Sequence, residues 1–174
     1  SAASDVYKRQ VSLNIETPGA ANLAKLSKKK RYVEDIIEPM KLISRLTGKG
    51  ARYERVKQTT QFIVGAAGEK DSEIVRYMWG LYKRLGLQRV YFSAYQRQSG
   101  ETPAEVGGGD ILTREHRLYQ VDFLVRRYGF GEGEIEFDEN GNLGLDCDPK
   151  EAWARRHPEA FPVAANKAGY YELL

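Results

Sequence analysis

The stretch that decides the fold runs from Gln58 to Glu73 and has the sequence QTTQFIVGAAGEKDSE. Strand-forming residues at 59–64 are followed by the small residues GAAG and then by the helix-start residues Asp71 and Ser72. This order predicts a strand, a tight turn and a helix. In parallel α/β proteins such a turn lies at the carboxyl end of its strand, where ligands bind, and its glycines let backbone N–H groups approach a ligand.

The turn has two interpretations. Glu69 follows it directly and is expected to stand at the lip of a ligand site. A glycine-rich turn also occurs where the chain needs only a tight connection between strand and helix. The flanking sequence has to decide between them.

Composition sets broad limits on the class of protein. The 174 residues suffice for one domain with a substantial core, or for a large piece of a barrel that normally needs about 250 residues. No apolar run approaches the ~20 residues of a membrane span, and there is no secretory signal. Cys147 is the only cysteine, which excludes an internal disulfide and any cluster or zinc site built from the chain's own thiols. A reducing, cytoplasmic location is expected.

Charge is distributed unevenly along the chain. Residues 24–60 carry eleven Lys or Arg against four Asp or Glu, whereas residues 131–151 carry eight acids against Lys150. The basic segment is typical of a surface that holds phosphates, and equally of a solvated helical face. Its densest part is the candidate for nucleic-acid binding and consists of Lys28, Lys29, Lys30 and Arg31.

The first ten residues, SAASDVYKRQ, do not have the pattern of a folded element. SDVYKRQ resembles a translated sequencing adapter, so residues 1–10 are expected to be a non-native tail on a longer protein. The alternative is an ordinary polar tail. At the other end AGYYELL (168–174) looks helical and has no terminating signal, which again suggests truncation.

Val11 to Glu16, VSLNIE, alternates between apolar and polar residues. This period predicts a strand whose apolar face packs on helices and whose polar face, with Asn14 and Glu16, points into a barrel or crevice. An edge strand with one face in water is the alternative.

The remaining pattern alternates helix and strand. Apolar residues at helical spacing predict helices over 33–46, interrupted at Pro39, over 71–85, ended by Gly86, and over 114–128, ended by Gly129. RVYFS (89–93) is a third strand. Alternation of this kind predicts a parallel sheet with right-handed crossovers.

Two other segments are expected to be irregular. Residues 95–113 form a long polar loop that is either a lid or disordered. Residues 135–145 are acidic, with short strand-like pieces around an Asn140-Gly141 turn, and Asp148-Pro149 opens a helix that reaches about Arg156.

Catalytic motifs are few. The sequence has no nucleophile elbow, HExxH, phosphate loop or dinucleotide fingerprint, and His116 and His157 lack metal-ligand spacing, so no metal ligands are predicted. Arg114, Glu115 and His116 are interpreted either as substrate contacts or as a helix-start charge pattern. Aromatic residues on the third strand are interpreted as base-stacking groups or, alternatively, as core.

Several motifs together resemble a known family. They are SLNIE, QTTQFIVGAAGE, RVYFSAY, LTREHRLYQVDFLVRRYGF and DPKEAWARRHPEAFPVAANKA, and they extend over nearly all of residues 11–174. In this order they resemble the later part of radical SAM proteins of a family described as acting in DNA modification or repair. Genes of that family tend to lie beside one for a uracil-DNA-glycosylase-like protein, which the resemblance suggests as a partner.

The resemblance implies an α/β fold, the C-terminal part of a (βα) partial TIM-like barrel, in which a [4Fe-4S] cluster and S-adenosylmethionine meet at the carboxyl ends of the strands. SLNIE resembles the strand that binds the ribose and methionine parts of the cofactor, which implicates Asn14 and Glu16. FIVGAAGE resembles the strand and turn beside the adenosine, although its spacing departs from that of many members. The residues implicated there are Gly65, Ala66, Gly68 and Glu69, with Tyr91 and Ser93 on the next strand.

One departure from the family pattern is large, because the CxxxCxxC loop that holds the cluster is absent. We therefore interpret the sequence as a fragment that is inactive alone: residues 1–10 a tail, 11–130 the later part of the barrel, and 131–174 the acidic segment with a truncated helical extension. Family members continue into a DNA-binding segment, so nucleic acid, with DNA favoured, is the expected target of the intact enzyme.

Two other functions stay open at this point. One is a non-catalytic nucleic-acid-binding protein on a degenerate barrel, which would bind DNA without the cofactor. The other is a barrel enzyme that acts on a small phosphorylated metabolite.

Overall fold

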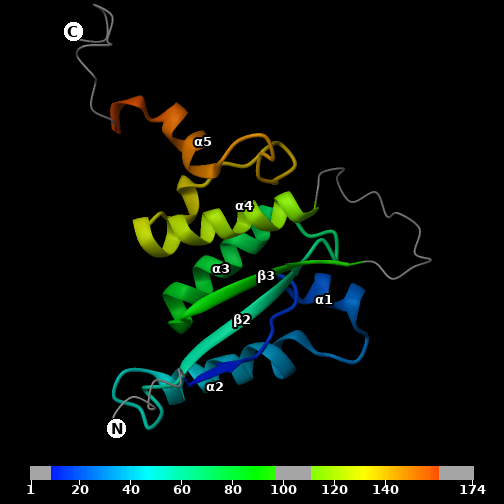
Figure 1. The fold of residues 1–174 in the computed structure, drawn as a ribbon. Helices are drawn as coiled ribbons and strands as arrows, with labels where there is room; N and C mark the ends of the chain where they lie inside the picture. The colour runs from blue at the N-terminus through cyan, green and yellow to red at the C-terminus, as the bar shows by residue number, and fades with distance from the viewer. Residues whose placement is uncertain (1–8, 97–110, 161–174) are drawn as a thin grey trace, which may run out of the picture.

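The computed structural model describes residues 9–96 and 111–160 and arranges them around a three-stranded parallel sheet (Figure 1). The strands β1 (Gln10–Ser12), β2 (Lys57–Val64) and β3 (Arg89–Ala94) lie side by side in sequence order. The register pairs Ser12 with Thr59 and Thr59 with Arg89. The α/β class with parallel strands, expected from the sequence, is confirmed.

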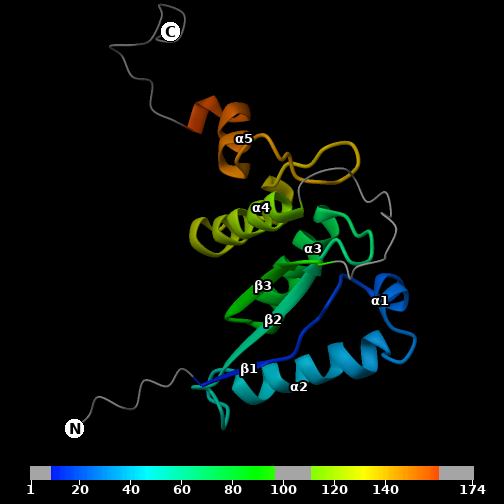
Figure 2. The same cartoon turned by 45° about the vertical axis from the view of Figure 1, so that its right-hand side comes forward.

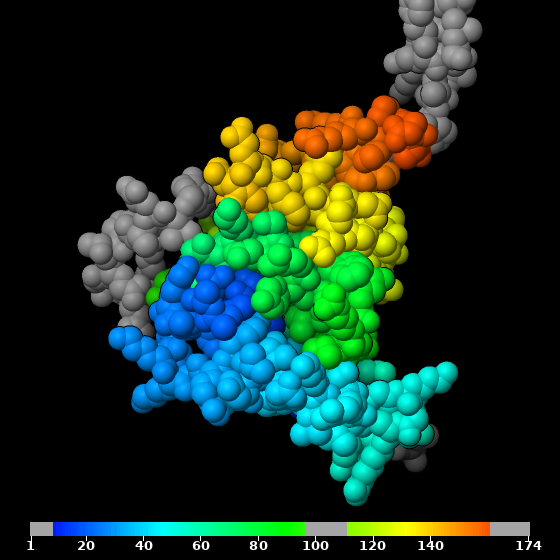
Figure 3. Space-filling view, turned by 180° about the vertical axis from the view of Figure 1, so that it is seen from behind, coloured from blue at the N-terminus to red at the C-terminus, as the bar shows by residue number. Residues whose placement is uncertain are grey.

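Helices connect and follow the strands, as parallel pairing requires. Between β1 and β2 lie α1 (Ala20–Leu26), the π-helical segment η1 (Tyr32–Ile37) and α2 (Glu38–Thr47). α3 (Asp71–Leu85) joins β2 to β3. After β3 come α4 (Ile111–Phe123), π-helical η2 (Leu124–Tyr128), η3 (Glu132–Glu134), α5 (Pro149–Arg156) and η4 (Pro158–Ala160). Figure 3 shows that the segment between α2 and β2, in cyan, projects at the end of the molecule away from α5.

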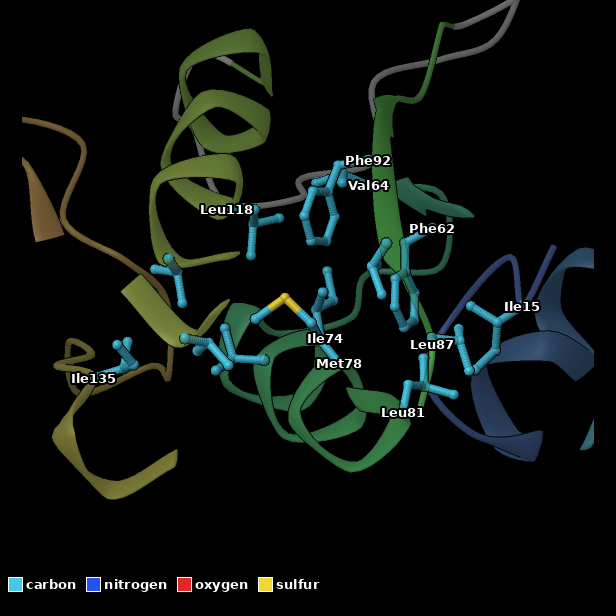
Figure 4. Close-up of a cluster of buried hydrophobic side chains, with 14 of the residues drawn as sticks. Ile15, Phe62, Val64, Ile74, Met78, Leu81, Leu87, Phe92, Leu118 and Ile135 are labelled. Atoms are coloured by element: carbon cyan, nitrogen blue, oxygen red, sulfur yellow. The ribbon is translucent and has the colours of Figure 1, made fainter. Parts of the chain in front are cut away.

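One face of the sheet carries the hydrophobic core. Phe62 and Phe92 stack there with ring centroids 6.1 Å apart, and α3 and α4 close over them (Figures 2 and 4). α2 contributes to the same core through Met40, which is fully buried. The predicted inward residues of the two later helices are confirmed as buried: Ile74, Val75, Met78, Leu81, Leu118, Val121, Leu124 and Val125.

The opposite face of the sheet is polar. Because successive side chains of a strand point to opposite faces, every second residue of each strand lies on this face. These residues are Ser12, Asn14, Thr59, Gln61, Ile63, Arg89, Tyr91 and Ser93, all exposed or half-buried except Thr59. None of them belongs to the hydrophobic core cluster of the described residues. All core-forming helices therefore pack on the other face.

The outer edge of β3 is closed by side chains. Its outward N–H groups donate to side-chain oxygens of α3 and α4: Val90 to the Tyr82 hydroxyl at 2.9 Å, Phe92 to the Tyr119 hydroxyl at 3.0 Å, and Ala94 to the Glu115 carboxylate at 2.6 Å. The Tyr119 hydroxyl also donates to the Phe92 carbonyl at 2.9 Å. Because backbone groups at an edge need partners, these bonds substitute for a further strand.

A buried carboxylate supports this edge. Asp122 is fully buried and its carboxylate accepts a hydrogen bond from the Tyr82 hydroxyl. It also forms ion pairs with Arg126 at 2.7 Å and with Arg89 at 3.4 Å. Burial raises the pKa of the Tyr82 hydroxyl, and the neighbouring Asp122 charge raises it further, so the phenol stays a donor. The edge is held by a charged network rather than by single bonds.

The outer edge of β1 is different. Leu13 N–H donates to the Thr59 carbonyl at 3.4 Å and Lys57 N–H to the Arg9 carbonyl at 2.9 Å, so alternate backbone groups of β1 face β2. Those of Gln10 and Ser12 consequently point away from the sheet, and both residues are exposed. Within residues 9–96 and 111–160 they have no backbone partner. The sheet is closed at β3 and open at β1.

Most predicted helix boundaries are confirmed. Pro39 lies where η1 gives way to α2, and Gly86, with φ of 63°, ends α3. Asp148 caps α5 by accepting from the N–H groups of Lys150 and Glu151. Gln10, the last residue of the predicted tail, begins β1 and pairs with Lys57, and the non-native origin of residues 1–10 stays a prediction. Most of the predicted lid (95–113) and the end of the helical extension (161–174) lie outside the described residues.

The predicted strand-like pieces within 135–145 are wrong, since the described part of the chain has no strand there. The predicted Asn140-Gly141 turn is confirmed, with Gly141 at a φ of 81°, and Asp138 organises it: its carboxylate accepts from the N–H groups of Asn140 and Asn142, both at 2.8 Å. Leu143 N–H bonds to Asp71 at 3.0 Å, so it is not available for a strand partner. In the described ranges, no helix has the length and apolar character needed to cross a membrane.

Replacement of Tyr119 by Phe tests the closed edge. Tyr119→Phe leaves the buried N–H of Phe92 without an acceptor, which should lower the free energy of unfolding by about 1–3 kcal/mol. Urea denaturation measures the loss, and hydrogen exchange should accelerate at the Phe92 amide. The control is Tyr128→Phe, whose ring is 55% exposed and whose loss should stay within about 0.5 kcal/mol. Equal stability of the two variants would contradict the role of Tyr119.

Candidate functional site

The candidate site lies at the carboxyl edge of the sheet, where the predicted residues of all three strands meet. Glu16 follows β1 and bridges to Phe62, Gly65 directly follows β2, and Ser93 lies in the last part of β3 opposite Ile63. Glu16 and Ser93, which are 77 positions apart in the sequence, thus lie on either side of Ile63 at this edge. Parallel pairing alone accounts for this convergence.

Glu16 has an unusual backbone. Among the described residues it is the only non-glycine with positive φ, at 67°. Its N–H donates to the Gln61 carbonyl at 3.0 Å and its carbonyl accepts from Ile63 N–H at 2.7 Å, so both neighbours fix the conformation. A non-glycine residue in this region costs of order 1–3 kcal/mol, and such strain clusters at functional sites. The Glu16 carboxylate pairs with Lys30 at 3.1 Å.

The glycine turn is held by Glu69. Its carboxylate accepts from Gly65 N–H at 2.5 Å and from Ala67 N–H at 2.9 Å, and the residue is 2% exposed. The expectation that Glu69 stands at the lip of a site is therefore wrong, because its carboxylate is turned inward to the backbone. The same contact occupies the Gly65 N–H, so that group is not free for a ligand.

The two predicted glycines have different surroundings. Gly65 has a φ of 85°, which favours glycine, and a Cβ there would also lie 2.6 Å from the Ile111 side chain of α4. Gly68, with φ of 69°, faces open space, and its N–H and that of Ala66 have no hydrogen-bond partner among the described residues. The turn thus offers two backbone donors, at Ala66 and Gly68.

Two cations lock the turn from outside. Lys25 Nζ donates to the Ala67 carbonyl at 2.8 Å, and Arg114 donates to the Glu69 carbonyl at 2.6 Å and to Asp71 at 2.7 Å. Asp71 is fully buried; burial raises its carboxyl pKa, while Arg114 and the Leu143 N–H act in the opposite direction. The site is consequently tied to the start of α4.

This arrangement decides between the two interpretations of Arg114, Glu115 and His116. Arg114 fixes the turn and Glu115 holds the edge of β3, so both have structural partners. His116 is exposed. No local pattern predicts the pairing of Asp71 with Arg114, because 43 residues separate them.

The polar face leads up to this edge. Asn14 is exposed and its Oδ1 accepts from the Ser12 hydroxyl at 3.3 Å. Ser93 is half-buried and Tyr91 is 38% exposed. Phe92 is 3% exposed in the core, which settles its two interpretations in favour of packing. Asn14 and Ser93 remain available to a ligand on this face.

The predicted basic cluster is partly neutralised. Lys30 pairs with Glu16, and Arg31 pairs with Asp35 at 3.4 Å and Glu34 at 3.9 Å. Lys28 and Lys29 are exposed beside them. Of the four residues, only these two lysines lack an acidic partner within the described ranges.

No metal centre is found in the described part of the chain. It contains no group of three or more His, Cys, Asp or Glu residues that could hold an ion. Comparison of the chain with family models, with curated proteins and with solved structures found no match. Functional inference therefore depends on the residues themselves.

Replacement of Glu69 by Ala tests how the turn is held. Glu69→Ala removes the acceptor of two N–H groups, and a hydrogen bond to a charged group contributes about 1.5–3 kcal/mol. We expect the free energy of unfolding, measured in urea, to fall by about 3 kcal/mol. The control Glu38→Ala removes an exposed pair with Lys41 and should cost less than about 1 kcal/mol. A Glu69 variant as stable as the control would show that the turn does not need the carboxylate.

Proposed function

We propose that this chain forms the last three strands of a radical SAM partial barrel and binds S-adenosylmethionine at the carboxyl edge of its sheet. The topology supports this proposal. Strands in sequence order with right-handed crossovers put every covering helix on one face, as in a barrel, whereas a doubly wound sheet has helices on both. The polar second face would then line the interior of the barrel.

The unequal sheet edges also support the proposal. Side chains occupy the edge of β3, so a further strand would have to displace Tyr82, Tyr119 and Glu115. The edge of β1 is open, and exposed apolar side chains lie nearby in the first helical layer: Val33, Leu42 and Leu46. In the proposed barrel β3 is the terminal strand and preceding strands add beside β1.

The observation that carries the proposal is the strained backbone of Glu16. The strained residue pairs through its backbone with Phe62 and Ile63, just before the turn that carries the unpaired N–H groups of Ala66 and Gly68, and its carboxylate contacts Lys30. Glycine or asparagine would adopt this conformation at lower cost, and the exposed ion pair of the Glu16 carboxylate with Lys30 returns at most about 1 kcal/mol. Binding of a ligand through the Glu16 carboxylate explains why a glutamate occupies this strained position.

The available groups fit the cofactor. The Glu16 carboxylate would accept hydrogen bonds from the hydroxyl groups of a ribose, and the Asn14 amide would bind polar atoms of the methionine part. The N–H groups of Ala66 and Gly68 would donate to the adenine ring, and Ser93 on the next strand lies at the same edge. Gly65 and Glu69 act indirectly, because they hold the turn that presents these donors. When bound, S-adenosylmethionine supplies the reactive adenosyl group of the superfamily.

The [4Fe-4S] cluster does not fit this chain. Cys147 is the only thiol and lies half-buried before α5. We assign no reaction step to a cluster here. The proposed role of the chain is to bind and orient the cofactor for an enzyme that modifies or repairs nucleic acid in the cytoplasm.

A second candidate is a non-catalytic nucleic-acid-binding protein on the same sheet. Exposed basic residues without acidic partners favour it, Lys28 and Lys29 among them. It predicts salt-dependent binding of DNA that persists in a Glu16→Ala variant, without any binding of S-adenosylmethionine.

Calorimetric titration with S-adenosylmethionine tests the leading proposal. We expect saturable binding that Glu16→Gly weakens by at least about tenfold. The same variant should be at least as stable as the parent, because glycine relieves the strained φ by about 1 kcal/mol. Lost affinity with retained stability is the signature of a residue kept for binding rather than for folding.

Glu54→Gln is the matched control, since Glu54 is an exposed glutamate far along the chain whose carboxylate accepts only the Gly50 N–H. It should leave the affinity within about twofold of the parent. Absence of binding to the parent chain, or equal affinity of the parent and Glu16→Gly, would overturn the cofactor assignment.

A further inference from the structure

The amino ends of the strands lie at the end of the sheet opposite the candidate site. In a parallel sheet with helical crossovers, the helices run back along the strands, so their carboxyl ends gather at the amino ends of the strands. Hydrogen bonds confirm this arrangement: Ser44 of α2 donates to the Leu85 carbonyl of α3 at 2.7 Å, and Gln88 N–H donates to the Gln58 carbonyl at 2.8 Å. Arg89 reaches Asp122 of α4 in the same region.

Exposed basic side chains concentrate on this face. They come from the end of α2, the segment 48–57, the end of α3 and the end of η2 (Figure 3, where the cyan, green and yellow segments follow one side). We call them the amino-end basic face, which consists of Arg45, Lys49, Arg52, Arg55, Lys57, Lys83, Arg84 and Arg127. All are exposed, and none forms an ion pair within the described residues.

Acidic residues scarcely offset this charge. Segment 45–57 contains one acid, Glu54, and its carboxylate accepts the Gly50 N–H. Segments 83–89 and 123–131 contain none. The face is therefore more positive than the Lys28–Arg31 cluster, in which Lys30 and Arg31 are paired.

Favourable interaction with helix dipoles explains only part of the pattern. Lys83, Arg84 and Arg127 lie in the last turns of helices, where cations are stabilised by the dipole. Arg52 and Arg55 lie in the non-helical segment after α2, so that explanation does not apply to them. Tyr53 between them is 45% exposed, with the Arg52 guanidinium 5.4 Å from its ring centre. An exposed aromatic ring among unpaired cations is the combination that binds both phosphates and bases.

We propose that the amino-end basic face binds the phosphate backbone of a nucleic acid. It lies at the far end of β2 from the candidate cofactor site, and the eight residues of that strand span about 26 Å. A nucleic acid on this face is anchored by its backbone, away from any reacting base. This inference rests on the proposed function and adds the surface that binds the nucleic acid. Its test uses no cofactor, so a failure of DNA binding is distinguishable from a failure of S-adenosylmethionine binding.

Fluorescence anisotropy with a labelled single-stranded DNA of about 20 nucleotides tests the proposal at several salt concentrations. The variants reverse two charge pairs separately, Arg52→Glu with Arg55→Glu, and Lys83→Glu with Arg84→Glu. The matched control is Arg155→Glu with Arg156→Glu on α5, which makes the same change in net charge at two adjacent arginines that already pair with Glu151 and Glu136. Circular dichroism checks folding, and two independent pairs guard against a local unfolding effect.

We expect each amino-end pair to weaken DNA binding by more than about tenfold and to reduce the salt slope by about 0.7 per lost phosphate contact, while the control changes affinity by less than about threefold. S-adenosylmethionine binding should be unchanged in all three variants. Equal loss in the control would show an effect of net charge alone and overturn the proposal. No DNA binding by the parent, or tighter binding to phosphatidylserine vesicles than to DNA, would also overturn it.

Discussion

The structure depends on the acceptor that the Glu69 carboxylate provides for the turn after β2. Gly65 is half-buried and Ala67 is buried, so N–H groups of the turn need an acceptor within the protein. Glu69 binds two of them and Arg114 anchors its carbonyl, so sheet, turn and α4 are fixed by one buried side chain. The N–H groups of Ala66 and Gly68 have no hydrogen-bond partner among the described residues.

The three-stranded sheet is asymmetric in two ways, and both follow from where its backbone and side-chain groups find partners. One face is filled by apolar side chains under the helices, and the other is polar. The edge of β3 is satisfied by Tyr82, Tyr119 and Glu115, whereas β1 offers unpaired backbone groups. Our two proposals rest on these features: a small ligand at the carboxyl edge, and a polyanion at the amino end, which is rich in unpaired cations.

Periodicity predicted the parallel strands, the helices and the buried residues of α3 and α4, because these depend on local spacing. It failed beside the correctly predicted Asn140-Gly141 turn, where the flanking residues form no strands: Leu143 N–H bonds to Asp71 rather than to a strand partner. The inward direction of Glu69 and its link through Arg114 could not be predicted either, since the partners come from another helix. The positive φ of Glu16 has no sequence signature.

The central claim is that the carboxyl edge of the sheet holds S-adenosylmethionine. Its most direct test is an NMR titration of the uniformly ¹⁵N-labelled chain with S-adenosylmethionine, followed through the backbone amides. The account predicts that the amide signals of Glu16, Ala66 and Gly68 shift progressively with ligand while those of Lys83 and Arg84 stay in place. Shifts confined to the amino end of the sheet, or none at Ala66 and Gly68 at saturation, would contradict it.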